Sequence, residues 1–597
     1  MIVEQDQTTS VPARRVLWRP ILFGYATLVA FWAWKFFSTW QAWGDLTIDS
    51  GHEMYLPAIL AQGKVLYRDA WYMYGPAAPY LNSYLFRIFG IHLNVLYWAG
   101  SLAALGSAIF LYLVGMRLGV ALIGWTAGAV VLAEAFHPSL FCFPLPYAFA
   151  AVYGCLVGCA FLWFVLKANI SEHWGWMFAA GCAAALALLL KPEFGTACYG
   201  TLAICLVLHA CQGRSLRSIG RELLAIIPGV LACVAAVLWM ISLRGVEFIT
   251  QENVVSWPSS YFMKNYGKRW LTLNGFTVAP ADFVAALSRT LPLAGAALLV
   301  FCYWWWRRND ARARLWKAFL TVMFLVLLAY EKFKIAKIFF PQDMVLYVAV
   351  ATVFYVWLFR KNRDAKSGAF LLIFSYCTLL AFRILMGMHP DGYSIYYNGP
   401  VVLCFLVLLS LAIPREGRSH RFVIVAESIF CLACLGVTVQ HARVLESVGR
   451  SYVPLVTDRG TIRVSKNKAE QYALAIQFMK EKARQGESVL SVPEDTSLYF
   501  LSETICPIRL FSFTPGVLAP GKMTDETIRE IDQKHVRYLL WSSRIFPEFG
   551  TTVFGKDFDQ PVGEYFRAHY QPVRRLMPWY PGANWDWSAV IWERNSD

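Results

Sequence analysis

The sequence is poor in charged residues. Asp, Glu, Lys and Arg make up 16% of its 597 residues, whereas soluble domains carry about 25%. Hydrophobic residues make up 57% of the chain, and its mean hydropathy is +0.45. This composition excludes a mainly soluble protein and is typical of a chain that crosses a membrane many times.

The motifs of several common enzyme classes are also missing. The chain contains no P-loop, no G-x-G-x-x-G fingerprint and no H-E-x-x-H zinc motif. Its 14 Cys are scattered, mostly through apolar runs, which indicates small apolar filler rather than a disulfide framework or a zinc site. The D-x-D tripeptide from Asp557 to Asp559 matches a pattern of nucleotide-sugar enzymes, but no glycine-rich phosphate loop lies near it. We therefore assign no function to this tripeptide.

Long apolar runs are what the chain has instead. A bilayer requires about 20 apolar residues per helix, and runs of this kind predict a polytopic α-helical membrane domain over residues 1–443 with about thirteen transmembrane helices. The runs begin near Ile21, Val95, Val120, Pro146, Trp174, Thr196, Ala225, Phe283, Leu315, Gln342, Gly368, Pro400 and Phe422. The 24 Trp fit belts at the two membrane–water interfaces.

Basic residues orient the predicted helices. Arg14, Arg15 and Arg19 precede the first run, which lacks a small-residue cleavage site and is expected to be a retained anchor. With thirteen helices the later basic clusters fall on the same side, which the positive-inside rule assigns to the cytoplasm. These clusters are Arg214/Arg217/Arg221, Arg307/Arg308/Arg312/Arg314, Arg360/Lys361/Arg363/Lys366 and Arg415/Arg418/Arg421. The net charge of +15 is therefore explained mostly by the basic residues that orient the helices in the membrane, and no nucleic-acid partner is expected.

The end of the chain has a different composition. We expect residues 444–465 to be a linker and residues 466–597 to form a small α/β domain outside the membrane. Residues 468–484 and 524–533 are predicted to be helices, the second with Thr524 as a candidate cap. Residues 488–492, 536–541 and 589–592 are predicted to be strands from their β-branched and aromatic content.

The first outer loop, residues 41–94, is long and rich in aromatic residues. Residues 53–62, ended by Gly63, and residues 76–89, ended by Gly90, fit two short amphipathic helices that would lie along the membrane interface. Asp49 and Glu53 are four residues apart and would share a helix face. A carboxylate just outside a membrane can act as a base on a lipid-linked substrate.

A structural interpretation of the same acids stays open. Ser50-x-x-Glu53 matches a capping box, and Asp49 would then be an ordinary carboxylate at a helix start. Asp69 is either a second acid of the site or a surface partner of Arg68.

Ionisable residues also collect at the outer ends of the predicted helices. They are Glu134 and His137, Lys191 and Glu193, Glu331, Lys332, Lys334 and Lys337, and Arg383 and His389. Charges beside a bilayer are costly and are functional candidates, although a single lysine can also be a snorkelling anchor. Together they predict a basic outer cavity suited to a phosphate.

The first outer loop resembles that of the membrane-embedded GT-C glycosyltransferases, in particular the branch with protein O-mannosyltransferases and the lipid A aminoarabinose transferase. The matching pattern is Asp49, Gly63, Tyr67-Arg68-Asp69, Gly75-Pro76, Tyr80-Leu81-Asn82 and Phe86-Arg87-Ile88-Phe89-Gly90. The odd number of helices and the outer C-terminal domain extend the resemblance over most of the chain.

The resemblance implies a mechanism. An acceptor hydroxyl would attack the anomeric carbon of a sugar on a polyprenyl phosphate, with inversion. Asp49 would be the general base or would orient the hydroxyl, and Glu53 and Asp69 are the other catalytic candidates. The leaving phosphate needs positive groups, for which Lys191 and Arg383 come first and Lys334 and Lys337 follow. The sugar- or acceptor-binding candidates are Glu134, Glu193, Tyr74 and His389.

The chain departs from the family pattern in three places. Ser50 stands where the family usually has Glu, and Glu53 is the candidate substitute. Tyr74-Gly75-Pro76 lacks the Lys that the aminoarabinose transferases have near this proline, so the phosphate contact must come from elsewhere. Residues 137–147 contain no Asp to match the second acid of the family, for which Glu134 is the nearest candidate.

We therefore expect a glycosyltransferase of a bacterial cytoplasmic membrane, with its N-terminus in the cytoplasm. Its partners would be the bilayer, a polyprenyl-phosphate sugar and an envelope acceptor that offers a lipid, glycan or protein hydroxyl. The sequence identifies no cofactor besides the lipid-linked donor; Asp49, Glu53 and Asp69 can hold a divalent metal ion, but no ligand spacing demands one. A flippase for lipid-linked sugars and a non-catalytic scaffold are the alternatives; a transporter would place its ionisable residues nearer the bilayer midplane.

Overall fold

The computed structural model describes residues 14–171, 173–252, 265, 345–381, 393–413, 420–551, 553–576 and 587–596. The predicted helices that begin near Phe283 and Leu315 lie outside these residues. Several candidate site residues also lie outside them, namely Glu331, Lys332, Lys334, Lys337, Arg383 and His389.

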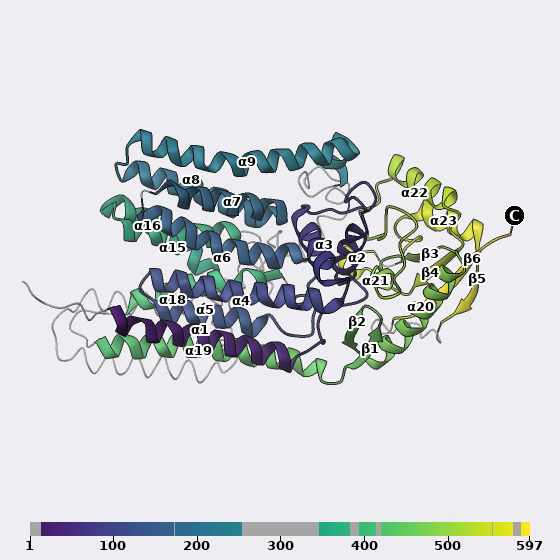
Figure 1. Ribbon diagram of the computed structural model, residues 1–597, viewed down its shortest axis with the longest axis horizontal. Coiled ribbons are helices and arrows are strands. Elements are labelled where there is room, and N and C mark those ends of the chain that lie inside the picture. Colours follow the sequence, from purple (N-terminus) through teal and green to yellow (C-terminus); the bar gives the residue numbers. More distant parts are fainter. Residues whose placement is uncertain are drawn as a thin grey trace, which may run out of the picture.

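A bundle of roughly parallel helices makes up the larger part of the molecule (Figure 1). Its helices are α1 (Arg14–Ser38), α4 (Leu93–Arg117), α5 (Ala121–Glu134), α6 (Phe149–Ile170), α7 (Trp174–Leu190), α8 (Pro192–Cys211), α9 (Leu216–Arg244), α15 (Val345–Asn362), α16 (Ala365–Leu380), α18 (Asn398–Ala412) and α19 (His420–Gly449). Within the described residues, 6 helices are long and apolar enough to cross a membrane, in α1, α4, α6, α8, α9 and α19. The chain is a helical membrane protein, and the number thirteen stays a prediction.

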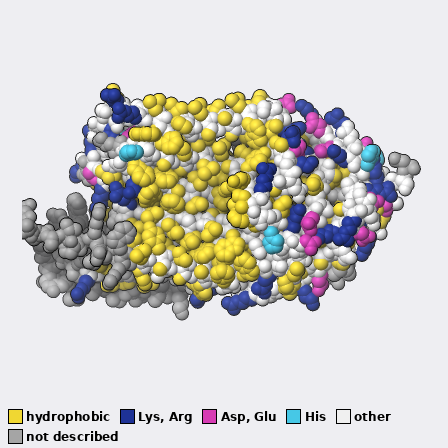
Figure 2. All heavy atoms as spheres, in the orientation of Figure 1, with side chains coloured by type: hydrophobic (Ala, Val, Ile, Leu, Met, Phe, Trp, Pro, Cys, Tyr) yellow, Lys and Arg dark blue, Asp and Glu magenta, His cyan; other side chains and the backbone are white. Residues whose placement is uncertain are grey.

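The two ends of the bundle differ. The α8–α9 connection, which carries Arg214, and the α15–α16 connection, which carries Arg363, lie at the end away from the C-terminal domain (Figure 1). Figure 2 shows hydrophobic side chains over the middle of the molecule and Lys and Arg side chains at both ends. An apolar middle with charged residues at both ends is the distribution that a membrane-spanning bundle requires.

The first outer loop forms helix α2 (Ser50–Ala61) and helix α3 (Ala77–Phe89). Gly63 and Gly90 follow them with φ of +94° and +88°, a backbone region that favours glycine. The expectation that both helices lie along the membrane interface is wrong for α2, because nearly all of its residues are buried. The Tyr55 hydroxyl of α2 accepts a hydrogen bond from the Cys506 amide of the C-terminal domain, at 2.9 Å.

The C-terminal domain contains a four-stranded sheet in the order β3-β4-β6-β5. Its strands are β3 (Val489–Val492), β4 (Tyr538–Ser542), β5 (Tyr570–Arg575) and β6 (Ala589–Arg594). Strand β3 pairs parallel with β4, whereas β6 runs antiparallel to both β4 and β5. Its helices are α20 (Lys466–Arg484), α21 (Ser497–Leu501), α22 (Lys522–Gln533) and α23 (Gln560–His569), with a short turn η5 (Pro547–Phe549). The predicted helices and strands of this domain correspond to α20, α22, β3, β4 and β6.

Two details of this domain differ from the prediction. Residues 444–465 are not a plain linker, because they hold the end of α19 and the hairpin of β1 (Val453–Thr457) and β2 (Gly460–Val464). Thr524 does not cap α22, since this helix begins at Lys522 and the Thr524 hydroxyl donates to the Ala519 carbonyl at 3.0 Å.

The β1–β2 hairpin fixes both ends of the first outer loop. The Arg463 amide donates to the Gln41 carbonyl at 2.8 Å, and the Leu93 amide donates to the Arg459 carbonyl at 2.8 Å. Farther along the chain, the η1 turn (Phe248–Glu252) after α9 pairs with the C-terminal domain through Glu252 and Arg509, at 2.9 Å. The hairpin therefore holds the two ends of the first outer loop, and Arg509 attaches the segment after α9 to the C-terminal domain.

Candidate functional site

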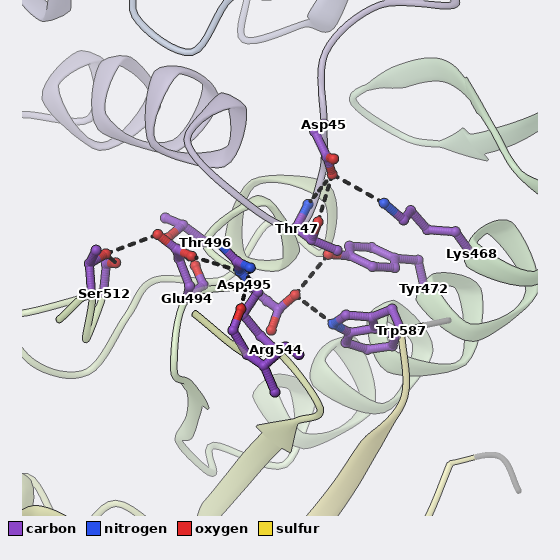
Figure 3. Close-up of polar contacts among 12 residues, drawn as sticks. Asp45, Thr47, Lys468, Tyr472, Glu494, Asp495, Thr496, Ser512, Arg544 and Trp587 are labelled. Carbon is purple, nitrogen blue, oxygen red and sulfur yellow. Dashed lines mark hydrogen bonds and ion pairs between the residues drawn. The ribbon is translucent and has the colours of Figure 1, made fainter. Parts of the chain in front are cut away.

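The start of α2 is held by the segment just before it. The Asp45 carboxylate accepts hydrogen bonds from the Thr47 amide at 2.9 Å and the Thr47 hydroxyl at 2.6 Å, and it pairs with Lys468 at 3.1 Å (Figure 3). Burial opposes ionisation of Asp45, but Lys468 and Thr47 outweigh it and hold its pKa below the usual value. These contacts fix the chain four residues before Asp49.

The C-terminal domain also contacts the segment before α2. The buried Asp495 carboxylate accepts hydrogen bonds from the Tyr472 hydroxyl at 2.9 Å and the Trp587 ring N–H at 2.6 Å (Figure 3). Two residues later, the Ser497 hydroxyl donates to the Leu46 carbonyl at 2.5 Å. A side chain at Gly51 would meet the Ser497 amide nitrogen at 2.5 Å, so glycine allows α2 to pack directly against α21.

Glu53 caps a helix other than its own. The side chain is 3% exposed, and Oε2 accepts a hydrogen bond from the Phe149 amide at the start of α6, at 2.8 Å. The first amides of a helix have no partner within it, so the carboxylate supplies one. Ser50 instead donates to the Leu145 carbonyl at 3.2 Å, so the capping box weighed from the sequence does not form.

The environment of Glu53 favours its protonated form. The pKa of this carboxyl is raised to about 8, mainly by burial; the neighbouring Asp49 contributes to the rise, and the Phe149 amide and Lys191 oppose it. Glu53 is thus within electrostatic range of both Asp49 and Lys191, although Lys191 lies far along the chain.

Lys191 lies in a cage of tyrosine rings. Its ammonium is 5.3 Å from the centre of the Tyr74 ring, 4.5 Å from that of Tyr147 and 5.3 Å from that of Tyr393. It also donates a hydrogen bond to the Tyr147 hydroxyl and pairs with Glu193 at 3.3 Å. The side chain is only 3% exposed, so aromatic faces and hydrogen bonds take the place of water around this charge.

The local sequence explains how Lys191 reaches this position. Pro192 is the first residue of α8, and the residue before a proline avoids the helical region. Lys191 is accordingly extended, with φ −153° and ψ 127°, between α7 and α8. A side chain at Gly75 would overlap the Leu189 carbonyl at the end of α7, so this glycine brings Tyr74 against the α7–α8 junction.

Glu193 and Glu134 bind neighbouring residues. Glu193 accepts a hydrogen bond from the Tyr397 hydroxyl at 3.1 Å, and Glu134 accepts one from the Asn398 side-chain amide at 2.8 Å. These acids therefore attach the end of α5 and the start of α8 to the start of α18.

Other acids have structural partners. Asp69 forms two hydrogen bonds of 2.9 Å with Arg68 and accepts the Val65 amide at 2.7 Å, which closes a turn and holds its pKa below the usual value. In the D-x-D tripeptide, Asp557 accepts the Val553 amide at 2.9 Å, and burial raises the pKa of Asp559. Across the described part of the chain, no group of three or more His, Cys, Asp or Glu is placed to hold a metal ion.

The structure adds residues that the sequence analysis did not select. Tyr147, Tyr393 and Tyr397 surround or hold the charged pair of Lys191 and Glu193. They come from segments that are more than two hundred residues apart, and a tyrosine in an aromatic-rich chain gives no local signal. Among the selected residues, Asp49, Glu53, Tyr74, Lys191 and Glu193 form one connected group, whereas Glu134 joins through α18.

Comparisons with known proteins concern the fold. No protein-family model and no curated protein matches the chain. The solved structures similar to it include the archaeal oligosaccharyltransferase AglB from Archaeoglobus fulgidus in complex with an inhibitory peptide and a dolichol-phosphate (11% identity, 88% of this chain and 70% of that one, TM-score 0.47). ArnT from Cupriavidus metallidurans bound to undecaprenyl phosphate is similar over 97% of this chain and 98% of its own, at 11% identity and TM-score 0.48. These are glycosyltransferases of the GT-C kind that the first outer loop resembles. At such identities and TM-scores nothing about activity follows, and function has to follow from the residues of the site.

Proposed function

We propose that the chain is an inverting glycosyltransferase that moves a sugar from a polyprenyl phosphate to a hydroxyl of a cell-envelope acceptor. The observation that supports this function is the grouping of acidic Asp49 and Glu53 with the caged Lys191, where the first outer loop meets the bundle. A transfer with inversion needs a base for the hydroxyl and a cation for the leaving phosphate, on opposite sides of the anomeric carbon.

The reaction is a single displacement. The acceptor oxygen forms a bond to the anomeric carbon while the bond from that carbon to the phosphate oxygen breaks. Asp49 takes the hydroxyl proton, and the electron pair of the broken bond stays on the polyprenyl phosphate. Lys191 balances the negative charge that develops on this phosphate.

The remaining residues have supporting roles in this proposal. Glu53 positions the start of α2 through the Phe149 amide, so it places Asp49 without contacting the substrate. Tyr74 and Glu193 shape the surroundings of Lys191, and Glu134 holds α18 beside them. Asp69 closes its own turn and takes no part in the chemistry.

The test is sugar transfer by the purified protein in liposomes, with a panel of radiolabelled polyprenyl-phosphate sugars. We expect release of polyprenyl phosphate from at least one donor, and loss of this release in Asp49→Asn. Near-normal transfer by the variant would defeat the assignment of the base. No turnover with any donor, combined with movement of labelled lipid across the bilayer, would instead identify a flippase.

A further inference from the structure

The strongest further observation is the ion pair between Lys191 and Glu193 inside the tyrosine cage. We propose that Glu193 is the resident counterion of Lys191, that the donor phosphate replaces it, and that its return expels the spent polyprenyl phosphate. This inference rests on the proposed function and adds a regulatory role to the same site.

Burial makes a counterion necessary. The Lys191 side chain is only 3% exposed, so its ammonium has lost most of its water, and such a charge is costly unless it is paired and hydrogen-bonded. The Tyr147 hydroxyl supplies a hydrogen bond, and the Glu193 carboxylate, 3.3 Å away, supplies the negative charge. A phosphate that approaches Lys191 therefore meets a position already served by a carboxylate.

Glu193 has a second partner, Tyr397, which would keep its carboxylate hydrogen-bonded when the ion pair with Lys191 breaks. Its Oε1 atom, the same atom that faces Lys191, accepts a hydrogen bond from the Tyr397 hydroxyl at 3.1 Å. When a phosphate takes Lys191, this hydroxyl still stabilises the displaced carboxylate. Without it, displacement would leave a half-buried carboxylate with one partner fewer, which costs free energy.

The exchange between Glu193 and the phosphate affects the donor and the product differently, because their phosphates carry different charges. The donor phosphate is a diester with one negative charge, whereas the released polyprenyl phosphate is a monoester with about −1.5 to −2 charges at pH 7. Repulsion by the nearby Glu193 carboxylate is therefore stronger for the product than for the donor. Glu193 should weaken binding of both and should speed release of the product most.

The test measures binding of polyprenyl phosphate to the full-length protein in nanodiscs. Glu193→Gln keeps an oxygen for Tyr397 but removes the charge, so we expect affinity to rise about tenfold. Tyr397→Phe should lower the affinity of the otherwise normal protein, but it should have little effect when combined with Glu193→Gln. Glu247→Gln, which removes an exposed acid outside the site, is the matched control and should bind like the unaltered protein.

Steady-state transfer gives a second measurement. If Glu193 expels the product, Glu193→Gln should show a lower kcat and stronger inhibition by added polyprenyl phosphate. Unchanged or weaker binding by folded Glu193→Gln would overturn the proposal, because Glu193 would then only position Lys191. If Glu193→Gln does not fold, normal binding by Tyr397→Phe would overturn it equally.

Failure of this inference can be distinguished from failure of the proposed function. Lys191→Met removes the phosphate-binding charge itself, and normal binding by this variant would show that the phosphate lies elsewhere. Binding that depends on Lys191 but not on Glu193 would leave the proposed function intact and remove only the counterion exchange.

Discussion

Helices α2 and α3 belong to the same outer loop and have similar lengths, yet they lie in opposite environments. Nearly all of α2 is buried between the bundle and the C-terminal domain. Helix α3 instead exposes a row of large apolar side chains, Leu81, Tyr84, Ile88 and Phe89. Burial on all sides fixes the position of the side chains of α2, whereas the exposed apolar face of α3 suits contact with a membrane surface.

The difference explains where chemistry can be located. A catalytic side chain must be held within a fraction of an ångström, which α2 achieves through Gly51, Ser50 and Glu53. Among the described residues, helix α3 has no such contacts along its exposed face, and it needs none if it only rests on lipid. Changes in α2 should therefore be far more damaging than changes in α3.

The largest effect is expected at the start of α2. Asp49→Asn removes the base and should lower the transfer rate by about 10²–10⁴-fold, since general-base catalysis contributes that much. Asp69→Asn, a change of the same kind in the same loop, should retain most of the activity because Asp69 closes a turn with Arg68 and Val65. Transfer assays on both folded variants check this contrast, and equal losses would contradict it.

Packing of α2 against α21 gives the next effect. Gly51→Val places carbon atoms where the Ser497 amide lies, and overpacking of this kind costs about 1–3 kcal/mol. We expect a lower melting temperature and reduced transfer, measured by thermal unfolding in detergent and by the liposome assay. An unchanged melting temperature in this variant would show that the close packing of α2 against α21 does not contribute to stability.

Glu53 should give the protein a distinctive dependence on pH. Its pKa in the folded protein is about 8, above the ordinary value of 4.5. The proton is thus bound more tightly in the folded state, so the stabilisation is complete below about pH 4.5 and is lost as the pH rises through 8. Glu53→Gln should show a flatter melting temperature between pH 5 and pH 8 than the unaltered protein, and identical profiles would contradict the assignment.

The smallest effect is expected in α3. Replacing Ile88 and Phe89 by Ser removes exposed apolar surface, so stability in detergent should change by about 0.5 kcal/mol or less. Transfer in liposomes should fall by about twofold to threefold if these side chains rest on the bilayer. A large loss of stability in detergent would show that this face packs against protein.

Much of the fold could be predicted from local sequence. Apolar runs located the bundle helices, and Gly63 and Gly90 marked the ends of α2 and α3. Strand β5 was missed because it is a polar, exposed edge strand with Pro572 and a register shift, so it lacks the alternation of a half-buried strand. The burial of α2 was missed because its apolar residues fit a membrane surface and a protein core equally well.

The site was less accessible to prediction. Asp49, Glu53 and Lys191 were selected as ionisable residues near the membrane, but the cage of Tyr74, Tyr147 and Tyr393 depends on contacts between distant segments. The missing lysine of the first outer loop showed that a phosphate contact had to come from elsewhere. In the structure, Gly75 approaches the end of α7 and the Tyr74 ring lies beside the Lys191 ammonium, so Lys191 reaches the same loop.

The central claim is that Asp49 acts on the proton and Lys191 on the phosphate within one site. The most direct test loads a radiolabelled polyprenyl-phosphate sugar onto the unaltered protein, Asp49→Asn and Lys191→Met, and then measures bound donor and transferred sugar in the same samples. The account predicts that Asp49→Asn binds the donor normally but transfers no sugar, and that Lys191→Met loses binding. Normal binding and transfer by Lys191→Met, or loss of binding with normal transfer at saturating donor by Asp49→Asn, would contradict it.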